Sequence, residues 1–257
     1  MRAGKIKLNH KTDNTRHPDV TIDVIASAVL SRQPLPPMNC SSIDDGYRVQ
    51  RALSAHINAE SAGDLKMGAT ATAAQQQLGL DGPLAASLYA QGKLQNGCSL
   101  FVTEGQELEC EIAVITDGSG KPLGLMPAVE VVYLAFSRAE DLSIANAVAA
   151  NLGADRYICG EIVCWDESLT RVPISVFKDG VEIATMTNRY SFGSPASGAA
   201  WLVDEARKRG LWCDSEQRRV LLLGTCGNPT PAQPGRYNID FGPLGTVHFS
   251  LVRGGDT

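Results

Sequence analysis

The alternation of apolar and polar residues divides this chain into a helical first part and a strand-rich second part. Apolar residues recur at helical spacing over residues 19–30, before a proline-rich segment, and again after Ser42, a candidate N-cap. Further helices are expected over 72–80, 144–152 and 195–206. After residue 99, apolar runs predict strands over 99–103, 107–115, 125–134, 156–163, 172–177, 181–186 and 220–223, with a last hairpin over 239–251. The pattern therefore predicts an α+β fold.

The same pattern predicts one domain preceded by a tail. Residues 1–18 are polar and weakly basic without periodicity, which is typical of a flexible arm. We expect residues 19–257 to form a single domain, with a helical N-terminal part over 19–95 and a β-rich part over 96–257.

The predicted strand over 107–115 carries carboxylates at every second position and then becomes apolar. Glu109 and Glu111 share one face with Ala113, while Leu108 and Cys110 lie on the other, so both faces are apolar within a few residues. Two carboxylates about 7 Å apart on such a strand repel each other and are costly to bury. Either the strand frays into solvent at its acidic end, or a divalent cation lies between the carboxylates.

A third carboxylate, Glu130, lies within the apolar run over 125–134. A bare carboxylate is too costly to bury there, so Glu130 should be neutralised, paired or bound to a metal ion. Together with Glu109 and Glu111 it makes a three-carboxylate set that suits an octahedral ion with open positions.

Lys66 lies between two apolar residues, Leu65 and Met67, and needs a partner if it is buried. Drawn into a pocket with Glu109 and Glu111, it would offer a cation to a carboxylate substrate, and partial desolvation would move its pKa towards acid or base duty. The alternative is a strand-end lysine whose ammonium group reaches water.

Two other places bear on candidate chemistry. Gly224 and Thr225 follow an apolar strand, where a backbone amide and a hydroxyl are predicted to face a ligand oxygen. His56 lies one position off the apolar stripe of its helix, which favours a packed or solvent-bridged histidine over a catalytic one.

Composition narrows the function classes. A net charge of −5 without a dense basic block argues against nucleic acid as a partner. The 7 cysteines show no CxxC spacing, which fits reduced thiols and a cytoplasmic protein. No apolar run reaches the roughly 20 residues of a membrane helix, so we expect no membrane partner. Nucleotide-binding glycine motifs are absent from the sequence.

The order of several short motifs resembles one known family. The segments are Asp45-Gly-Tyr-Arg-Val-Gln50, Leu65-Lys-Met-Gly-Ala-Thr70, Leu108-Glu-Cys-Glu-Ile-Ala113, Pro127-Ala-Val-Glu-Val-Val132, Gly193-Ser-Pro195, Ala200-Trp-Leu202, Leu223-Gly-Thr225, Pro234-Gly235 and Leu244-Gly-Thr-Val247. Their order and spacing over residues 20–252 resemble those of the 2-keto-4-pentenoate hydratases and 4-oxalocrotonate decarboxylases of the fumarylacetoacetate hydrolase superfamily.

This resemblance implies a fold, a site and a reaction. The fold would be the superfamily's curled mixed β-roll with helices outside, assembled as a homo-oligomer, with 19–257 as the catalytic domain. Glu109, Glu111 and Glu130 would bind Mg²⁺ or Mn²⁺, and Lys66 would be the catalytic lysine. The substrate would be a small unsaturated 2-oxo acid from aromatic-compound catabolism, which chelates the ion and is hydrated or decarboxylated through an enolate.

The chain departs from the family pattern at three places. Only a short turn joins Ile115 to Leu125, where the family usually carries a helix. Leu84 stands where the family has an aspartate near the substrate, and Ala150 replaces the aspartate of an Ala-Asp-Asn stretch while Asn151 is kept. A keto-enol isomerase or C–C hydrolase of the same superfamily, and a structural or ligand-binding paralogue without catalysis, therefore remain as alternatives to the lyase.

Overall fold

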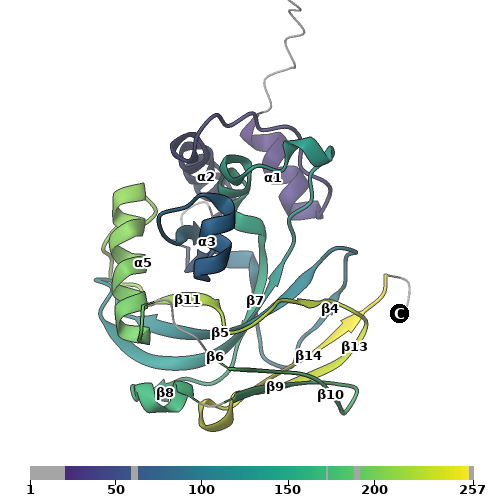
Figure 1. Cartoon of the computed structure of the whole chain (residues 1–257), viewed down its shortest axis with the longest axis vertical. Coiled ribbons are helices and arrows are strands. Elements are labelled where there is room, and N and C mark those ends of the chain that lie inside the picture. The colour runs from purple at the N-terminus through teal and green to yellow at the C-terminus, as the bar shows by residue number, and fades with distance from the viewer. Residues whose placement is uncertain (1–20, 59–62, 172, 188–191, 255–257) are drawn as a thin grey trace, which may run out of the picture.

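Two β-sheets and a layer of helices make up the structure, a computed structural model that describes residues 21–58, 63–171, 173–187 and 192–254 (Figure 1). The larger sheet has nine strands, in the order β2-β1-β11-β5-β6-β7-β3, with β12 added beside β5 and β8 beside β6. Its strands are β1 (Leu65–Gly68), β2 (Leu84–Ser87), β3 (Lys93–Leu94), β5 (Glu107–Thr116), β6 (Pro122–Val132), β7 (Ala154–Cys159), β8 (Val163–Cys164), β11 (Arg219–Thr225) and β12 (Thr230–Pro231).

The smaller sheet has five strands in the order β10-β9-β13-β14-β4. These are β4 (Ser99–Phe101), β9 (Pro173–Lys178), β10 (Val181–Thr187), β13 (Gly235–Asp240) and β14 (Thr246–Val252). Alternate residues of β5 and β6, such as Ile112 and Val129, pack with Val176, Ile239 and Val247 of the smaller sheet in one buried core. One face of the large sheet therefore lies against the small one.

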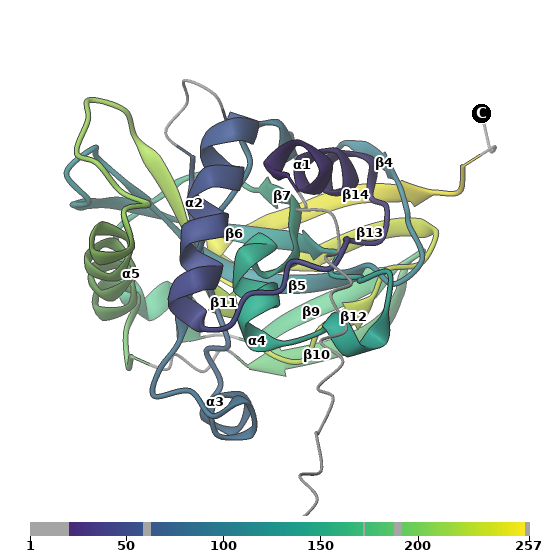
Figure 2. The same ribbon diagram turned by 90° about the horizontal axis from the view of Figure 1, so that it is seen from above.

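Helices cover the opposite face of the large sheet. These are α1 (Ile22–Ser31), α2 (Ile43–Asn58) and α4 (Ile144–Ala149), which lie over the sheet when it is viewed from above (Figure 2). Ala113, Ala128 and Leu222 are buried on this face, with Val29 of α1 and Ile57 of α2 packed against them. Two more helices, α3 (Thr72–Leu78) and α5 (Pro195–Arg209), lie at the side, and α5 packs into the core shared by the two sheets.

Local sequence explains where these helices begin and end. Ser42 accepts a hydrogen bond from the Asp45 amide, which confirms the predicted cap of α2. Proline at the first turn of α5 and Gly210 in the left-handed conformation behind it match the usual helix boundaries. No helix in the described part of the chain is long and apolar enough to cross a membrane.

The α+β prediction is confirmed, but three element predictions are wrong in detail. Strand β2 was not expected, because its leucine, alanines and serine carry no strand signal. The helix expected over 144–152 ends at Ala149, since the following residues leave helical geometry, and β7 ends at Cys159 rather than at Val163. The predicted tail over 1–18 lies outside the described residues.

Candidate metal centre

The register of two neighbouring strands brings the three glutamates together. Glu109 of β5 lies directly opposite Glu130 of β6, and Glu111 lies two residues further along on the same face. One carboxylate oxygen from each of the three lies within 4.8 Å of the others. The fraying alternative is excluded for this strand, because Glu111 and Glu130 are fully buried and Glu109 is half-buried.

A bulge in the neighbouring strand fixes one of these carboxylates. The pairing of β11 with β5 shifts between Leu222 and Thr225, and Gly224 within the shift has a φ of 91°. Its amide donates a hydrogen bond of 2.6 Å to Glu111 Oε2. A side chain at position 224 would bring a Cβ to 2.4 Å from Thr70 Cγ2, so glycine is required there.

Lys66 reaches the cluster from β1. Lys66 pairs with Leu222 of β11. This pairing puts the Lys66 side chain on the helix-covered face of the sheet, where the glutamates also lie. Lys66 Nζ donates to Glu130 Oε1 at 2.5 Å and to the Leu152 carbonyl at 3.1 Å. The side chain is only 3% exposed, so the alternative in which it reaches water is excluded.

A tight turn after α4 presents the Leu152 carbonyl. Asn151, Leu152 and Gly153 all have positive φ values, of 57°, 52° and 71°. Asn151 and Leu152 are not glycine, so a positive φ is unfavourable for them. Such a conformation persists only where surrounding contacts hold it. The buried Asn151 amide supplies these, because its Oδ1 accepts from the Ser87 amide at 2.8 Å and its Nδ2 donates to the Ser87 carbonyl.

Burial and mutual repulsion raise the pKa of all three carboxyl groups. Burial raises the pKa of Glu130 to about 7, although the Lys66 ammonium opposes this. Burial and then the charges of Glu130 and Glu109 raise the pKa of Glu111 well above its ordinary value. Burial also raises the pKa of Glu109. If all three carboxyl groups were ionised, their negative charge would exceed what Lys66 alone compensates.

We expected desolvation to lower the pKa of Lys66, so that it could act as an acid or a base. In this ion-free arrangement that expectation is wrong, because the pKa is raised. Burial does lower the pKa of the ammonium, but the charges of Glu130, Glu109 and Glu111 outweigh it and leave the pKa above its ordinary value. Lys66 Nζ is therefore protonated here.

Two carboxylate oxygens without a hydrogen-bond partner show whether the three glutamates suit a bound cation. Within the described residues, Glu111 Oε1 and Glu130 Oε2 are buried and accept no hydrogen bond. Buried carboxylate oxygens of this kind are costly unless a donor or a cation satisfies them. An all-oxygen set of three carboxylates is the ligand set of a hard divalent ion. The cluster thus fits a divalent cation.

The other predicted residues have different surroundings. The Gly224 amide is already used by Glu111, and the Thr225 hydroxyl donates to the Gly227 carbonyl at 3.2 Å, so a substrate role for these two groups stays a prediction. His56 is a half-exposed residue of α2, 3.6 Å from Asp23 and away from the cluster. Sequence reasoning missed the Leu152 carbonyl, for which the Asn-Leu-Gly sequence of a left-handed turn was the available signal.

The three departures from the family pattern are accommodated by packing. Leu84 is buried with Tyr47 and Val148, and Ala150 is buried in the cluster around Leu53. The turn between β5 and β6 is held by Asp117, whose carboxylate accepts hydrogen bonds from the amides of Ser119 and Lys121. Neither apolar replacement leaves a gap at the described site.

Comparisons with known proteins place these features in context. No protein-family model matches the chain. The chain is 26% identical over 267 aligned residues to 2-keto-4-pentenoate hydratase 2 of Dechloromonas aromatica, covering 92% of this chain and 98% of that protein. A second relative, 2-keto-4-pentenoate hydratase of Paraburkholderia phymatum, is 24% identical over 252 residues, with 88% and 94% covered. Among solved structures, 4-oxalocrotonate decarboxylase from Pseudomonas putida G7, complexed with magnesium and adipate, superposes with a TM-score of 0.78 at 20% identity, covering 90% of this chain and 95% of that one.

The predicted resemblance is therefore confirmed, at the low sequence identity of 24–26%. The predicted β-roll with outer helices is confirmed by the structural match. The sequence relatives are named as hydratases, in agreement with the expectation of an enzyme of the hydro-lyase or decarboxylase type. A second structure of the P. putida protein is a complex with calcium and acetate.

Proposed function

We propose that this protein is a divalent-metal-dependent lyase that acts on a small unsaturated 2-oxo acid, by hydration as in a 2-hydroxypenta-2,4-dienoate hydratase or by decarboxylation as in a 4-oxalocrotonate decarboxylase. The observation that carries the proposal is the convergence of Lys66 with Glu109, Glu111 and Glu130 on one buried face of the sheet. The names of the sequence relatives and of the structural neighbour supply the two reactions.

In this proposal Glu109, Glu111 and Glu130 hold Mg²⁺ or Mn²⁺, hard ions that favour carboxylate oxygens. When bound, such an ion polarises the carboxylate and keto oxygens of a 2-oxo acid and stabilises negative charge that develops on them. The Gly224 amide orients Glu111 from outside the cluster, as outer hydrogen-bond partners do in metal sites generally.

Lys66 is the proton-handling group of the proposal. Its Nζ is held between Glu130 Oε1 and the Leu152 carbonyl, so that the ammonium has a fixed position beside the carboxylates. Both candidate reactions need a proton delivered to a substrate carbon, in hydration during ketonisation of the dienol and in decarboxylation after loss of CO₂. We assign that proton to Lys66 Nζ.

The surroundings of the cluster exclude water. Ala113, Ala128 and Met126 continue the same face of β5 and β6 beyond the glutamates, and all three are buried. An apolar wall at this place strengthens the interactions of charged groups with a bound 2-oxo acid.

The test follows the ultraviolet absorbance of 2-hydroxypenta-2,4-dienoate and 4-oxalocrotonate with added Mg²⁺ or Mn²⁺. The proposal expects turnover of one substrate that is lost in Glu109→Gln and in Lys66→Ala, and release of CO₂ separates decarboxylation from hydration. Ion binding without turnover of either acid would instead support the ligand-binding paralogue. Leu84 and Ala150 favour that alternative, because they stand where the family has aspartates.

Homo-oligomer formation and a cytoplasmic location are further parts of the proposal. They rest on the resemblance and on the cysteine pattern of the sequence. Size-exclusion chromatography with light scattering tests the first, since a monomer at all concentrations would contradict it.

A further inference from the structure

A second cavity lies near the end of α1, and none of the glutamates or Lys66 lines it. It has a volume of about 210 Å³ between α1, the segment after β2 and strand β7. A single water molecule needs roughly 10–15 Å³ of such space, so the cavity exceeds the room for one water many times over. The cavity is therefore large enough for a small organic molecule.

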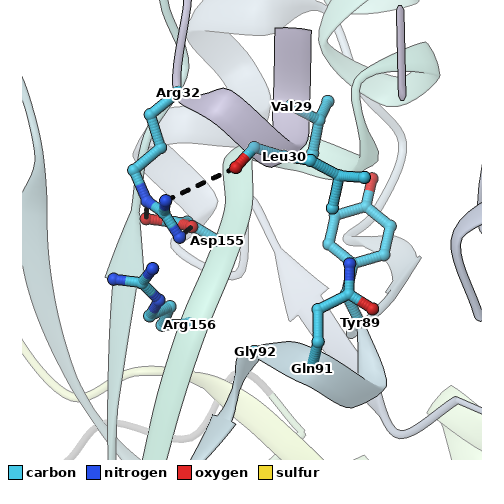
Figure 3. A pocket seen from close by; sticks show the side chains of 8 residues that line it. All are labelled: Val29, Leu30, Arg32, Tyr89, Gln91, Gly92, Asp155 and Arg156. Atoms are coloured by element: carbon cyan, nitrogen blue, oxygen red, sulfur yellow. Dashed lines mark hydrogen bonds and ion pairs between the residues drawn. The ribbon is translucent and has the colours of Figure 1, made fainter. Parts of the chain in front are cut away.

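The cavity has a charged wall and a largely apolar wall. Figure 3 shows Arg32, Asp155 and Arg156 together on one side, with Val29, Leu30 and Tyr89 on the other. Gln91 adds a side-chain amide on the apolar side. Such a division suits a ligand with one charged end and one apolar end.

The charged wall has one more positive than negative group. Asp155 binds Arg32 through two contacts of 3.0 Å, and it also accepts a hydrogen bond of 2.6 Å from Gln106 Nε2. Its oxygens are thus engaged away from Arg156. Elsewhere in the described chain Arg156 has no hydrogen-bond acceptor or ion-pair partner, although the residue is half-buried.

The guanidinium of Arg156 is therefore a partly desolvated cation on the cavity wall, where the one carboxylate, Asp155, is shared with Arg32. Burial lowers the pKa of Arg156, and the nearby charge of Arg32 adds to this, while the charge of Asp155 opposes it without reversing the direction. Tyr89 is 2% exposed, and its hydroxyl lies beside the Asn151 side-chain amide. A carboxylate ligand in the cavity would supply hydrogen-bond acceptors to the Arg156 guanidinium.

We propose that this cavity binds a small organic monocarboxylate. Its carboxylate pairs with Arg156 beside Arg32, since a planar guanidinium matches a carboxylate with two parallel hydrogen bonds. Its apolar part lies against Val29, Leu30 and Tyr89. A single negative charge matches the surplus charge of the wall, and the apolar wall favours an organic acid over inorganic phosphate. The proposal does not depend on the lyase assignment.

Calorimetric titration of the whole protein with pentanoate tests this site. The proposal expects saturable binding of pentanoate, much weaker binding of the neutral pentanamide, and weaker binding of inorganic phosphate. Arg156→Gln should weaken pentanoate binding at least about tenfold, because it removes charge-assisted hydrogen bonds. Arg218→Gln is the matched control, since Arg218 is exposed and does not line the cavity.

Further variants separate this site from the glutamate cluster and guard against a folding defect. Leu30→Trp fills the cavity from a half-exposed position of α1 without changing either arginine, and it should also abolish binding. Glu111→Gln should leave pentanoate binding unchanged. Failure of pentanoate to bind, equal binding of pentanamide or of phosphate, or binding that is lost in Glu111→Gln but kept in Arg156→Gln and Leu30→Trp would each overturn the proposal.

Discussion

Lys66 Nζ lies 2.5 Å from Glu130 Oε1, although 64 positions separate the two residues in the chain. The contact depends on three successive strand pairings, because β1 pairs with β11, β11 with β5, and β5 with β6. A lysine on β1, the strand next to the edge strand β2, is thereby brought to a carboxylate in the middle of the sheet. This pair links the proposed metal site to the proposed proton donor.

Replacing Lys66 by methionine should lower kcat about 10²- to 10⁴-fold on the substrate that the protein turns over, because the proposed proton donor is lost while the side-chain volume is kept. Mg²⁺ affinity should be maintained or increased, since a competing cation is removed from the carboxylates. Lys93→Met is the control, because Lys93 pairs with Asp64 instead, at 3.0 Å. An unchanged kcat in Lys66→Met would contradict the assigned role.

Glu111→Gln should weaken Mg²⁺ or Mn²⁺ binding by more than the roughly 10- to 100-fold that the loss of an outer-shell partner costs. The same change removes a buried carboxylate repelled by its neighbours, so the ion-free protein should melt at the same temperature or higher. Glu107→Gln is the control for an unspecific effect of removing a carboxylate from β5, because Glu107 is an exposed residue on the same strand. Equal affinities of both variants in calorimetry would argue against a site at Glu111.

Ion-free stability should fall as the pH rises from about 4.5 to about 7. Burial raises the pKa of Glu130 from 4.5 to about 7, so in this window the folded protein holds a proton that the unfolded chain has lost. Ion binding needs the deprotonated carboxylates and should therefore strengthen over the same window. Melting curves with and without Mg²⁺ between pH 5 and pH 8 should show a stabilisation that grows with pH, whereas a constant stabilisation would contradict this account.

Gly224→Ala should lower ion affinity about 10- to 100-fold without touching a ligand, because it displaces the amide that orients Glu111. The φ of 91° and the close approach to Thr70 should also reduce the free energy of unfolding by about 1–3 kcal/mol. Gly82→Ala is the matched control, since a Cβ at Gly82 meets nothing within 4 Å. If Gly224→Ala binds Mn²⁺ like the unchanged protein in calorimetry, the amide does not tune the site.

Asn151→Ala should reduce the free energy of unfolding by about 2–4 kcal/mol, because it leaves both backbone groups of the buried Ser87 without a partner. The Leu152 carbonyl should then lose its fixed position beside Lys66, so kcat should fall more than KM changes. Asn96 also bridges two backbone groups, of Thr246 and His248, but at the surface, and Asn96→Ala should cost about 1 kcal/mol. Chemical denaturation that finds equal losses for both variants would contradict the prediction.

The grouping of the three glutamates was predictable, because strand periodicity alone places Glu109 and Glu111 on one face, and an isolated Glu130 in an apolar run needs a partner. The position of the apolar Ala113 on the same face, and the two N-terminal helices, followed from the same patterns. The bulge at Gly224 was not predictable in this way, since it depends on how β11 and β5 are aligned. The left-handed turn at Leu152 was missed because its stability comes from Ser87, 64 positions from Asn151.

The net direction of the Lys66 pKa was also beyond the sequence. Desolvation and nearby carboxylates shift the pKa of a lysine in opposite directions, and only the distances in the folded chain decide which effect is larger. Strand β2 was missed for a related reason, because its small residues are held as a strand by pairing with β1 and by burial rather than by their own propensity.

The central claim is that three glutamates from two neighbouring strands bind one divalent cation. The most direct measurement is an anomalous difference map from crystals of the protein grown with Mn²⁺. We predict a single strong peak between the carboxylates of Glu109, Glu111 and Glu130, within about 2.0–2.6 Å of an oxygen of each. A saturating Mn²⁺ concentration that gives no peak there, or a peak bound by other residues, would contradict the account.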